Sequence, residues 1–338
     1  MNLFEQQASN KRKSWLLVGA FLVFFAWLGF GGDLILWLAS REVPLGEVEY
    51  VHRVPFLGIL MVGAGIWIVL SVLRTGAEKV LWSTGAVPLT EAKTDAERQL
   101  ENVVDEMAIA AGVPRPRIYI IPDADPNAFV TGSNPAMSHL AVTQGLLDTL
   151  NRDELQAVVA HEFGHVKNED TQLMTLVAGL GGAILLIRDG VSRHMFRGGR
   201  GSSRSKGNGK GGNPLLILLL VLWVVSWLLA PLIVRLMAMG ISRKREYLAD
   251  AMAAQFTRNP MALADALDKI DRAVHPTKTI TAGAAHLCIA DPTGRWANSH
   301  EGRVADLFAT HPPMRLRVSR LRAMAFQAQK RAGDFPPK

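Results

Sequence analysis

The sequence predicts an α+β fold in which about four membrane-spanning helices carry a polar part made of further helices and a small β-sheet. Four long stretches of the 338-residue chain are almost free of charge, and at about 1.5 Å per residue each approaches or reaches the ~30 Å hydrocarbon core of a bilayer. The polar segments between them show helical and β-rich patterns. The predicted spans cover about residues 15–38, 54–73, 171–187 and 214–234.

These spans divide the chain into two membrane hairpins and one interrupted polar domain. The predicted divisions are residues 1–74 for the first hairpin, 75–170 and 236–325 for the two parts of the polar domain, 171–235 for the second hairpin and 326–338 for a tail. The third span is short and glycine-rich, so a buried soluble helix stays open as an alternative. Simple alternation would put the basic loop between spans three and four outside, so either the early spans dominate or these two spans form a hairpin that does not fully cross the membrane. The first apolar stretch is longer than the roughly 7 to 15 residues of a secretory signal, which favours an anchor.

Basic residues predict the orientation of the spans. Lys11, Arg12 and Lys13 precede the first span, whereas the loop that follows it has only Arg41 and Arg53 against three glutamates. Because cytoplasmic loops are enriched in Lys and Arg, the amino-terminal side of the first span is expected in the cytoplasm. Two crossings then return the chain to that side, which places the polar domain in the cytoplasm too.

The net charge of +7 and the single cysteine limit the binding partners and the cellular compartment that we expect for this protein. Cys288 has no partner for an internal disulfide, which suits a reducing compartment. The basic loop at 189–213 contains the segment RGGRGSSRSKGNGKGG, which lacks the aromatic residues that an RNA-binding tract would interleave. We therefore expect this loop to contact anionic lipid headgroups of the bilayer, and we expect no nucleic-acid partner.

The polar segments carry helix and strand patterns. Apolar residues at helical spacing predict a helix over 91–112. β-rich runs predict three short strands, at 117–122, 128–132 and 139–143. Asn151 followed three residues later by Glu154 is a capping-box pattern, so a helix is expected to begin at residue 152. No proline interrupts the chain before Pro214, so this helix is expected to run on into the third span.

The helix that is predicted from residue 152 contains a metal-binding pattern. His161 and His165 are four residues apart and therefore share one face of a helix, where both imidazoles can reach one ion. Glu162 follows the first histidine and can take a proton from a water whose pKa zinc lowers from 15.7 toward roughly 7. Two ligands and one base are the logic of the H-E-x-x-H motif, although so short a pattern also arises by chance.

A hydrolytic zinc site needs a third protein ligand and an open fourth position. Glu246 is the best candidate, and Asp250, one helical turn further, is placed to accept the free N–H of a ligating histidine. An exposed acidic pair is the alternative for these two residues. Asn168 and Asp170 follow His165 and either brace the same site or form an ordinary polar collar at the end of a membrane helix. Because two spans separate the two half-sites, both are expected on the same side of the membrane.

Six sequence blocks resemble, in the same order, those of the HtpX-like membrane metallopeptidases, which are relatives of the type I CAAX prenyl proteases. The blocks are NAFVTG, LAVTQGLL, DELQAVVAHEFGHVKNED, SRKREYLAD, AHLCIADP and THPPMRLRVSRL, and the resemblance covers roughly residues 95–325. It implies a gluzincin-type zinc peptidase domain on the cytoplasmic side of a bacterial inner membrane, with one zinc ion per chain. The implied substrates are misfolded or damaged membrane proteins, or unfolded polypeptides, in protein quality control under stress.

The resemblance also implies roles for the residues of the metal-binding pattern. His161, His165 and Glu246 match the metal ligands. Glu162 matches the catalytic base, and Asp250 matches the partner of a ligating histidine.

Two further blocks of the resemblance bear on the substrate. His311 and Arg317 match electrophilic or structural groups near the site, and a His-Pro-Pro helix cap is the alternative for His311. The strand SHLAVT resembles an edge strand to which an extended peptide adds. The residues that this implies for substrate binding are Asn127, His139, Leu140, Ala141 and Val142.

Other interpretations of the same residues stay open. A CAAX-type processing protease would need more than four spans to enclose a large intramembrane chamber. A non-catalytic, metal-stabilised membrane scaffold would usually add a fourth protein ligand and would not need Glu162 beside the ion. A transporter would need polar groups at midplane depth, whereas Asp33 falls at the edge of a span. The sequence predicts no particular oligomeric state.

Overall fold

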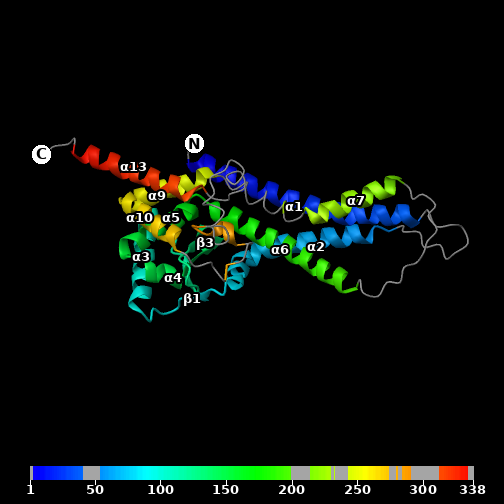
Figure 1. Ribbon diagram of the computed structural model, residues 1–338, viewed down its shortest axis with the longest axis horizontal. Coiled ribbons are helices and arrows are strands. Elements are labelled where there is room, and N and C mark those ends of the chain that lie inside the picture. Colours follow the sequence, from blue (N-terminus) through cyan, green and yellow to red (C-terminus); the bar gives the residue numbers. More distant parts are fainter. Residues whose placement is uncertain are drawn as a thin grey trace, which may run out of the picture.

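The computed structural model of the chain describes residues 3–40, 54–198, 214–229, 232, 243–273, 279–280, 284–290 and 312–333. Four apolar helices run along its long axis, and the sheet with the remaining helices forms a lobe at one end (Figure 1). The apolar helices are α1 (Leu3–Ser40), α2 (Phe56–Ser83), α6 (Asp170–Gly198) and α7 (Pro214–Leu228). This arrangement confirms the predicted fold class.

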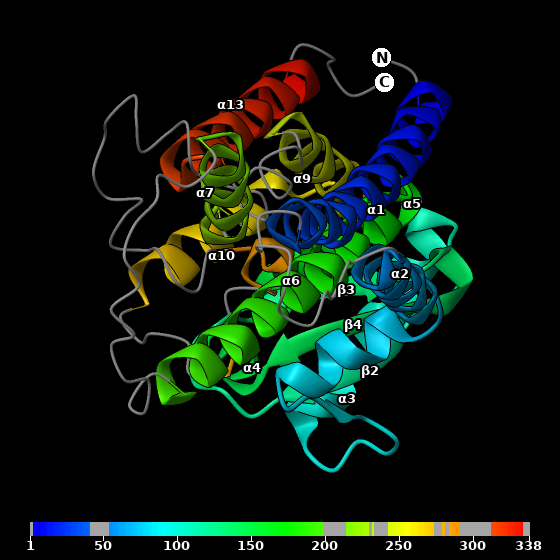
Figure 2. The same ribbon diagram turned by 90° about the vertical axis from the view of Figure 1, so that its right-hand side faces the viewer.

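Three segments of the described helices are long and apolar enough to cross a membrane, judged by length and composition: Gln7–Ser40, Phe56–Ser83 and Asp170–Ile187. α7 is a shorter apolar helix that covers the first part of the predicted fourth span. Most of the residues between the end of α7 and residue 234 lie outside the described part. α6 continues through Gly198, so the first part of the predicted loop 189–213 is helical and residues 199–213 lie outside the described part. Seen along the long axis, α1 lies beside α2, α6 and α7 (Figure 2).

α1 and α2 approach so closely at Gly29 that no side chain fits at this position. A Cβ atom added to Gly29 would lie 2.6 Å from the carbonyl oxygen of Leu57. Small residues at such crossings let membrane helices pack backbone against backbone. The Asp33 carboxylate accepts hydrogen bonds from the backbone N–H groups of Leu57 (3.2 Å) and Gly58 (2.6 Å). The charge in the predicted first span therefore caps the first turn of α2.

The lobe contains a four-stranded mixed sheet. Its strands are β1 (Val87–Pro88), β2 (Arg117–Ile121), β3 (Ala128–Gly132) and β4 (Ser138–Thr143). They lie in the order β1-β2-β4-β3, with β2 and β4 parallel and the two outer pairs antiparallel. The three predicted strands are thereby confirmed.

The expectation that SHLAVT forms an edge strand was wrong. β4, which carries His139, Leu140, Ala141 and Val142, pairs with β2 on one side and with β3 on the other. Both rows of its backbone hydrogen-bonding groups face neighbouring strands, so no peptide can add there. The edge on this side of the sheet belongs to β3.

Two polar helices begin at capping boxes, of which only the second was predicted. α3 (Asp95–Ala111) occupies most of the predicted helix 91–112 and starts at a capping box formed by Thr94 and Glu97. α5 (Arg152–Lys167) starts after Asn151, whose side chain accepts a hydrogen bond from the backbone N–H of Glu154 (3.0 Å). The Glu154 carboxylate accepts the N–H of Asn151 in return (2.9 Å). These two backbone N–H groups, which have no partner within the helix, are both satisfied, and the predicted start of α5 at residue 152 is confirmed.

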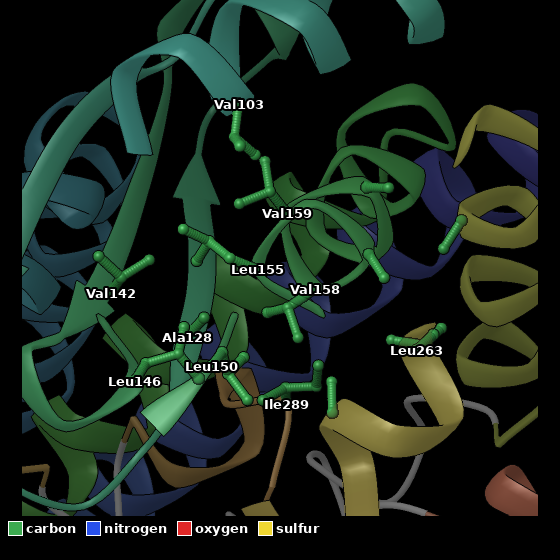
Figure 3. Packing of buried hydrophobic residues seen from close by; sticks show 14 of the residues in the cluster. Val103, Ala128, Val142, Leu146, Leu150, Leu155, Val158, Val159, Leu263 and Ile289 are labelled. Carbon is green, nitrogen blue, oxygen red and sulfur yellow. The ribbon is translucent and has the colours of Figure 1, made fainter. Parts of the chain in front are cut away.

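α5 lies at the centre of the lobe. Leu155, Val158 and Val159 are buried and point toward the sheet, α3 and α10 (Pro260–Arg272). Figure 3 shows them packed among Val103, Ala128, Val142 and Leu263, together with other core residues. Burying one Val or Leu side chain contributes about 1.5–3 kcal/mol, so this packing fixes the depth and rotation of α5.

The remaining helices close the lobe around α5. They are α4 (Gln144–Thr149), α9 (Arg243–Thr257), α13 (Met314–Gly333) and two short 3-10 turns, η1 (Pro135–Met137) and η2 (Ala285–Leu287). α9 packs along α5, and α13 packs against both α10 and α9. The lobe is thus assembled from segments that precede α6 in the sequence and from segments that follow α7.

The expectation of one helix running from residue 152 into the third span was wrong. α5 ends at Lys167, and α6 begins afresh at Asp170. Glu169 between them has a φ of 55°, a left-handed conformation that stops an α-helix. In an unbroken helix, positions 165 and 170 would face directions about 140° apart around the axis. The break is what brings Asp170 back beside His165.

Candidate metal centre

Three potential metal ligands converge between α5 and α9. His161 and His165 lie one turn apart on α5, and their Nε2 atoms lie 3.7 and 3.6 Å from the carboxylate of Glu246 on α9. One ligand atom from each of the three residues falls within 4.8 Å of the others. All three side chains are buried. Among the described residues, this is the one such group of His, Cys, Asp or Glu side chains.

The spacing of α5 and α9 depends on Gly164. A Cβ atom at this position would lie 3.1 Å from the Cα and 3.3 Å from the Cβ of Ala249. The two helices therefore touch almost backbone to backbone, within one helical turn of the two histidines and of Glu246. This close approach carries the carboxylate of Glu246 to the two imidazoles.

Each histidine makes a second contact through its other ring nitrogen. The Nδ1 atom of His161 lies 3.0 Å from Asp250, and that of His165 lies 3.2 Å from Asp170. A carboxylate that accepts the Nδ1 proton fixes the tautomer in which Nε2 is free to bind an ion. Both Nε2 atoms face Glu246, so the geometry directs their lone pairs to one point.

A buried arginine balances the charge of Asp250. Arg317 of α13 forms a bidentate pair with this carboxylate, at 2.7 and 3.0 Å, and donates a third hydrogen bond to the backbone oxygen of Ile289 (3.0 Å). Its Nη2 also lies 3.4 Å from both ring nitrogens of His161. Burial alone would raise the pKa of Asp250, but the Arg317 guanidinium and His161 together outweigh burial and hold that pKa below its usual value.

Asp170 occupies the corresponding place beside His165. Its Oδ1 accepts a 2.6 Å hydrogen bond from Asn10 of α1, and the Nε of Arg245 lies 3.5 Å from the same oxygen. Burial opposes a charge on His165, but Asp170 and the neighbouring Glu246 together raise its pKa to about 9. The pKa of His161 moves the other way and is lowered, mainly by burial.

Glu162 lies within this group without joining the ligand triad. Its side chain is fully buried, and its Oε2 has no hydrogen-bond partner among the described residues. Burial raises its pKa to about 7, against the lowering influence of His165 and of the backbone of Val130. A buried carboxylate with an unused oxygen and a pKa near neutrality is suited to exchange a proton with water. Together with the His, His and Glu donors, this arrangement fits a metal ion and a water.

The other predicted site residues lie around this centre. The side chain of Asn127 makes a hydrogen bond inside the protein, because its amide donates to the backbone oxygen of Ala290 (2.9 Å). Asn168 contributes its backbone oxygen to Asn10, at 3.1 Å, and its side chain makes no hydrogen bond among the described residues. His139 to Val142 lie on the inner strand β4, with the partners given above. His311 lies outside the described residues.

The outer edge of β3 is a feature that sequence reasoning missed. The backbone oxygen of Ala128 accepts a hydrogen bond from the N–H of Ile289 (2.9 Å), and the N–H of Gly132 donates to the hydroxyl of Thr175 (3.0 Å). Between them, Val130 lies beside Glu162. Asn10 was missed as well, because no local pattern reports a contact across 160 residues.

A family model and curated relatives show the family of this chain. The family model described as "Peptidase family M48" matches residues 94–325. A "Protease HtpX homolog" of Caldanaerobacter subterraneus subsp. tengcongensis is 37% identical over 324 residues, which cover 95% of this chain and 98% of that protein. One of Streptococcus gordonii is 37% identical over 322 residues, covering 95% and 100%. Among solved structures, the chain aligns with the crystal structure of S. mikatae Ste24p at 20% identity and a TM-score of 0.44. That alignment covers 91% of this chain and 66% of the other, just under two thirds.

Proposed function

Because the chain belongs to peptidase family M48 and is a membrane-bound metallopeptidase, we propose that it is a zinc endopeptidase that cleaves misfolded or damaged membrane proteins in quality control. The observation that carries this proposal is the buried convergence of His161, His165 and Glu246 with the carboxylate of Glu162 beside them. A purely structural metal site would not need that carboxylate.

The donor set favours zinc, one ion per chain. Two imidazole nitrogens and one carboxylate oxygen are the usual three ligands of catalytic zinc, which keeps its fourth position open. In this proposal His161 and His165 bind through Nε2, while Asp250 and Asp170 hold the two Nδ1 protons. Zinc, when bound, acidifies water and polarises the peptide carbonyl.

Glu162 moves the proton in the proposed reaction. Its free Oε2 accepts a proton from the water whose oxygen forms the new bond to the carbonyl carbon. The carboxyl group then delivers this proton to the nitrogen of the breaking C–N bond, so that an amine leaves and a carboxyl product remains. In the metal-free protein burial brings the pKa of Glu162 to about 7, so this group can both accept and release a proton near neutral pH.

Two further residues complete the proposed site. The guanidinium of Arg317 makes its shortest contacts to Asp250 and to the backbone of Ile289, and lies 3.5 Å from the carboxylate of Glu246. We therefore assign it the role of holding Asp250 in place. For His311 we keep the role of donor to the oxyanion that develops on the carbonyl, on the strength of its sequence block alone.

We place the substrate strand on β3 and no longer on β4. The middle of the outer edge of β3 lies beside Glu162, where an added strand would present its backbone to the ligand triad. A longer pairing would require Ile289 and Thr175 to give up their bonds to Ala128 and Gly132. In this arrangement His139, Leu140, Ala141 and Val142 support β3 from behind.

The metal centre is proposed to face the cytoplasm of a bacterial cell, beside the inner membrane. The basic residues Lys11 to Lys13 and the contact of Asn10 with Asp170 lie at the same end of α1, which ties the metal centre to the positively charged side. A cysteine introduced at the exposed Ile109, in a Cys288→Ser background, is then labelled by a membrane-impermeant maleimide only in inverted vesicles. Labelling of this cysteine in intact cells would show that the metal centre faces the opposite side of the membrane.

The deciding experiment compares the purified wild type with Glu162→Gln, and with Glu91→Gln as a matched control at an exposed site. Zinc content is measured by mass spectrometry, and cleavage is measured on an unfolded model protein and on a prenylated peptide. We expect one zinc per chain in all three proteins and cleavage of the unfolded protein in all but Glu162→Gln. Cleavage by Glu162→Gln would refute the mechanism. Cleavage of the prenylated peptide alone would favour CAAX-type processing, and zinc without any cleavage would favour a scaffold.

The quality-control role has its own test. The inactive Glu162→Gln protein, expressed in cells under membrane stress, is expected to retain damaged membrane proteins that mass spectrometry can identify after purification. An equal profile of bound proteins with and without stress would contradict the role.

A further inference from the structure

The amino-terminal part of α1 reaches the metal centre. Gln7 Nε2 donates a hydrogen bond to the backbone oxygen of Lys167 (3.0 Å), the last residue of α5. One turn on, the amide of Asn10 donates to the backbone oxygen of Asn168 (3.1 Å) and to the carboxylate of Asp170 (2.6 Å). α1 is therefore hydrogen-bonded through two side chains to the short break between α5 and α6.

The two contacts differ in what lies behind them. The contact of Gln7 ends on a backbone carbonyl, whereas that of Asn10 continues through Asp170 to Nδ1 of His165, 3.2 Å further. Asn10 and Asp170 are both buried, so no bulk water competes for these bonds. An asparagine amide has two N–H donors, and both are used here, one to anchor the side chain and one to hold the carboxylate.

Asp170 needs such a restraint. Its carboxylate has two oxygens, of which Oδ2 faces His165 and Oδ1 faces Asn10 and, at 3.5 Å, Arg245. The short bond to Asn10 fixes the rotation of the carboxylate about its last bond. Without this bond Oδ1 keeps only the longer contact to Arg245 among the described residues, and Oδ2 can turn away from Nδ1 of His165.

We propose that Asn10 is a positioning residue of the metal centre, which orients Asp170 so that His165 presents Nε2 to the ion. The amino-terminal extension of the first apolar helix is then part of the metal centre, in addition to anchoring it. This inference rests on the proposed function, because it takes His165 as a metal ligand.

The test replaces Asn10 by Leu and uses Gln7→Leu as the matched control. Both substitutions remove a polar anchor between α1 and the α5–α6 break, and only the first breaks the path to His165. Zinc affinity is measured by competition with a chelator, and the absorption spectrum of the cobalt-substituted protein reports ligand geometry. Removing a partner of a ligating histidine weakens metal binding about 10–100-fold, and Asn10 acts one bond further out. We expect about a tenfold loss and an altered cobalt spectrum for Asn10→Leu.

The control separates positioning from simple docking. Gln7→Leu is expected to keep the affinity and the cobalt spectrum of the wild type, even where its thermal unfolding temperature falls. If both variants lose affinity equally, or neither does, the positioning role of Asn10 is refuted. Asn10→Ser, which removes the amide with little change in bulk, decides the matter if Asn10→Leu does not fold. Failure of both Asn10 variants to fold, beside a folded Gln7→Leu, would show an anchor only.

These readouts are independent of proteolysis. A wild type that binds no zinc, or that cuts equally well as Glu162→Gln, would overturn the proposed function. A wild type that binds zinc and cuts, beside an Asn10→Leu variant with unchanged affinity and spectrum, would overturn this inference alone.

Discussion

Replacing Gly164 by Ala is expected to weaken metal binding and to destabilise the fold by at most about 2.5 kcal/mol. The added Cβ would lie 3.1 Å from the Cα of Ala249, and ordinary contact begins at 3.4 Å, so α5 and α9 must separate by about 0.3 Å. Overpacking of this kind costs about 1–3 kcal/mol. Alanine returns about 0.5–1 kcal/mol through its better helix propensity. The net destabilisation is therefore about 0–2.5 kcal/mol.

A shift of α5 against α9 is expected to disturb metal binding more than the stability of the fold. Glu246 stands on α9 less than one turn from Ala249, so the separation acts directly on the ligand triad. Metal–ligand distances are held within about ±0.2 Å, which is smaller than the shift. If about 1.4 kcal/mol of the strain falls on the bound state, zinc affinity falls tenfold.

The assay pairs chelator competition with thermal unfolding, and Gly182→Ala serves as the control. Gly182 also lies in a helix, but a Cβ there meets nothing within 4 Å, so only the propensity gain is expected. A Gly164→Ala protein that binds zinc like the wild type and gains stability like Gly182→Ala would refute the reasoning. In that case the close approach would not set the ligand geometry.

Three other predictions follow from the site. In metal-free protein, burial holds the pKa of Glu162 at about 7 against an ordinary 4.5. The folded state therefore keeps a proton that the unfolded state releases, and stability falls by about 3 kcal/mol as pH rises from about 4.5 to 7. Glu162→Gln should thus raise the unfolding temperature of the metal-free protein at pH 8 but not at pH 4; an equal effect at both would contradict this. Asp250→Asn should lower zinc affinity about 10–100-fold in chelator competition, and unchanged affinity would exclude a role in orienting His161. Thr175→Val leaves the N–H of Gly132 without its acceptor and should cost about 1–3 kcal/mol in denaturant unfolding, whereas Thr175→Ser should not.

Local signals predicted the elements of the site well. The capping pair Asn151 and Glu154 fixed the start of α5, and the four-residue spacing placed both histidines on one face. α-Helix geometry is set within a few residues, so a short pattern suffices to predict it. The same holds for the three short strands, whose composition and turns are local.

Long-range features could not be predicted in this way. The order β2-β4-β3 depends on which strands meet, and nothing in SHLAVT distinguishes an inner strand from an edge strand. The break at Glu169 involves neither glycine nor proline, and the weaker stop signals there, Asn168 and the basic last turn, were not recognised. The contact of Asn10 with Asp170 joins residues 160 positions apart, and no period or motif reports such a pairing.

The place of Arg317 in the chain has a consequence for biosynthesis. All three proposed ligands, and Asp250, are translated before α13, which supplies the guanidinium that faces this carboxylate. A nascent chain that has reached only α10 must leave Asp250 in water, because a buried carboxylate without its cation is strongly unfavourable. The centre reaches its final charge balance only after ribosomes have passed codon 317, when the four apolar helices have already left the exit tunnel. The charge balance of the metal centre is therefore expected to be complete only once α13 has been synthesised.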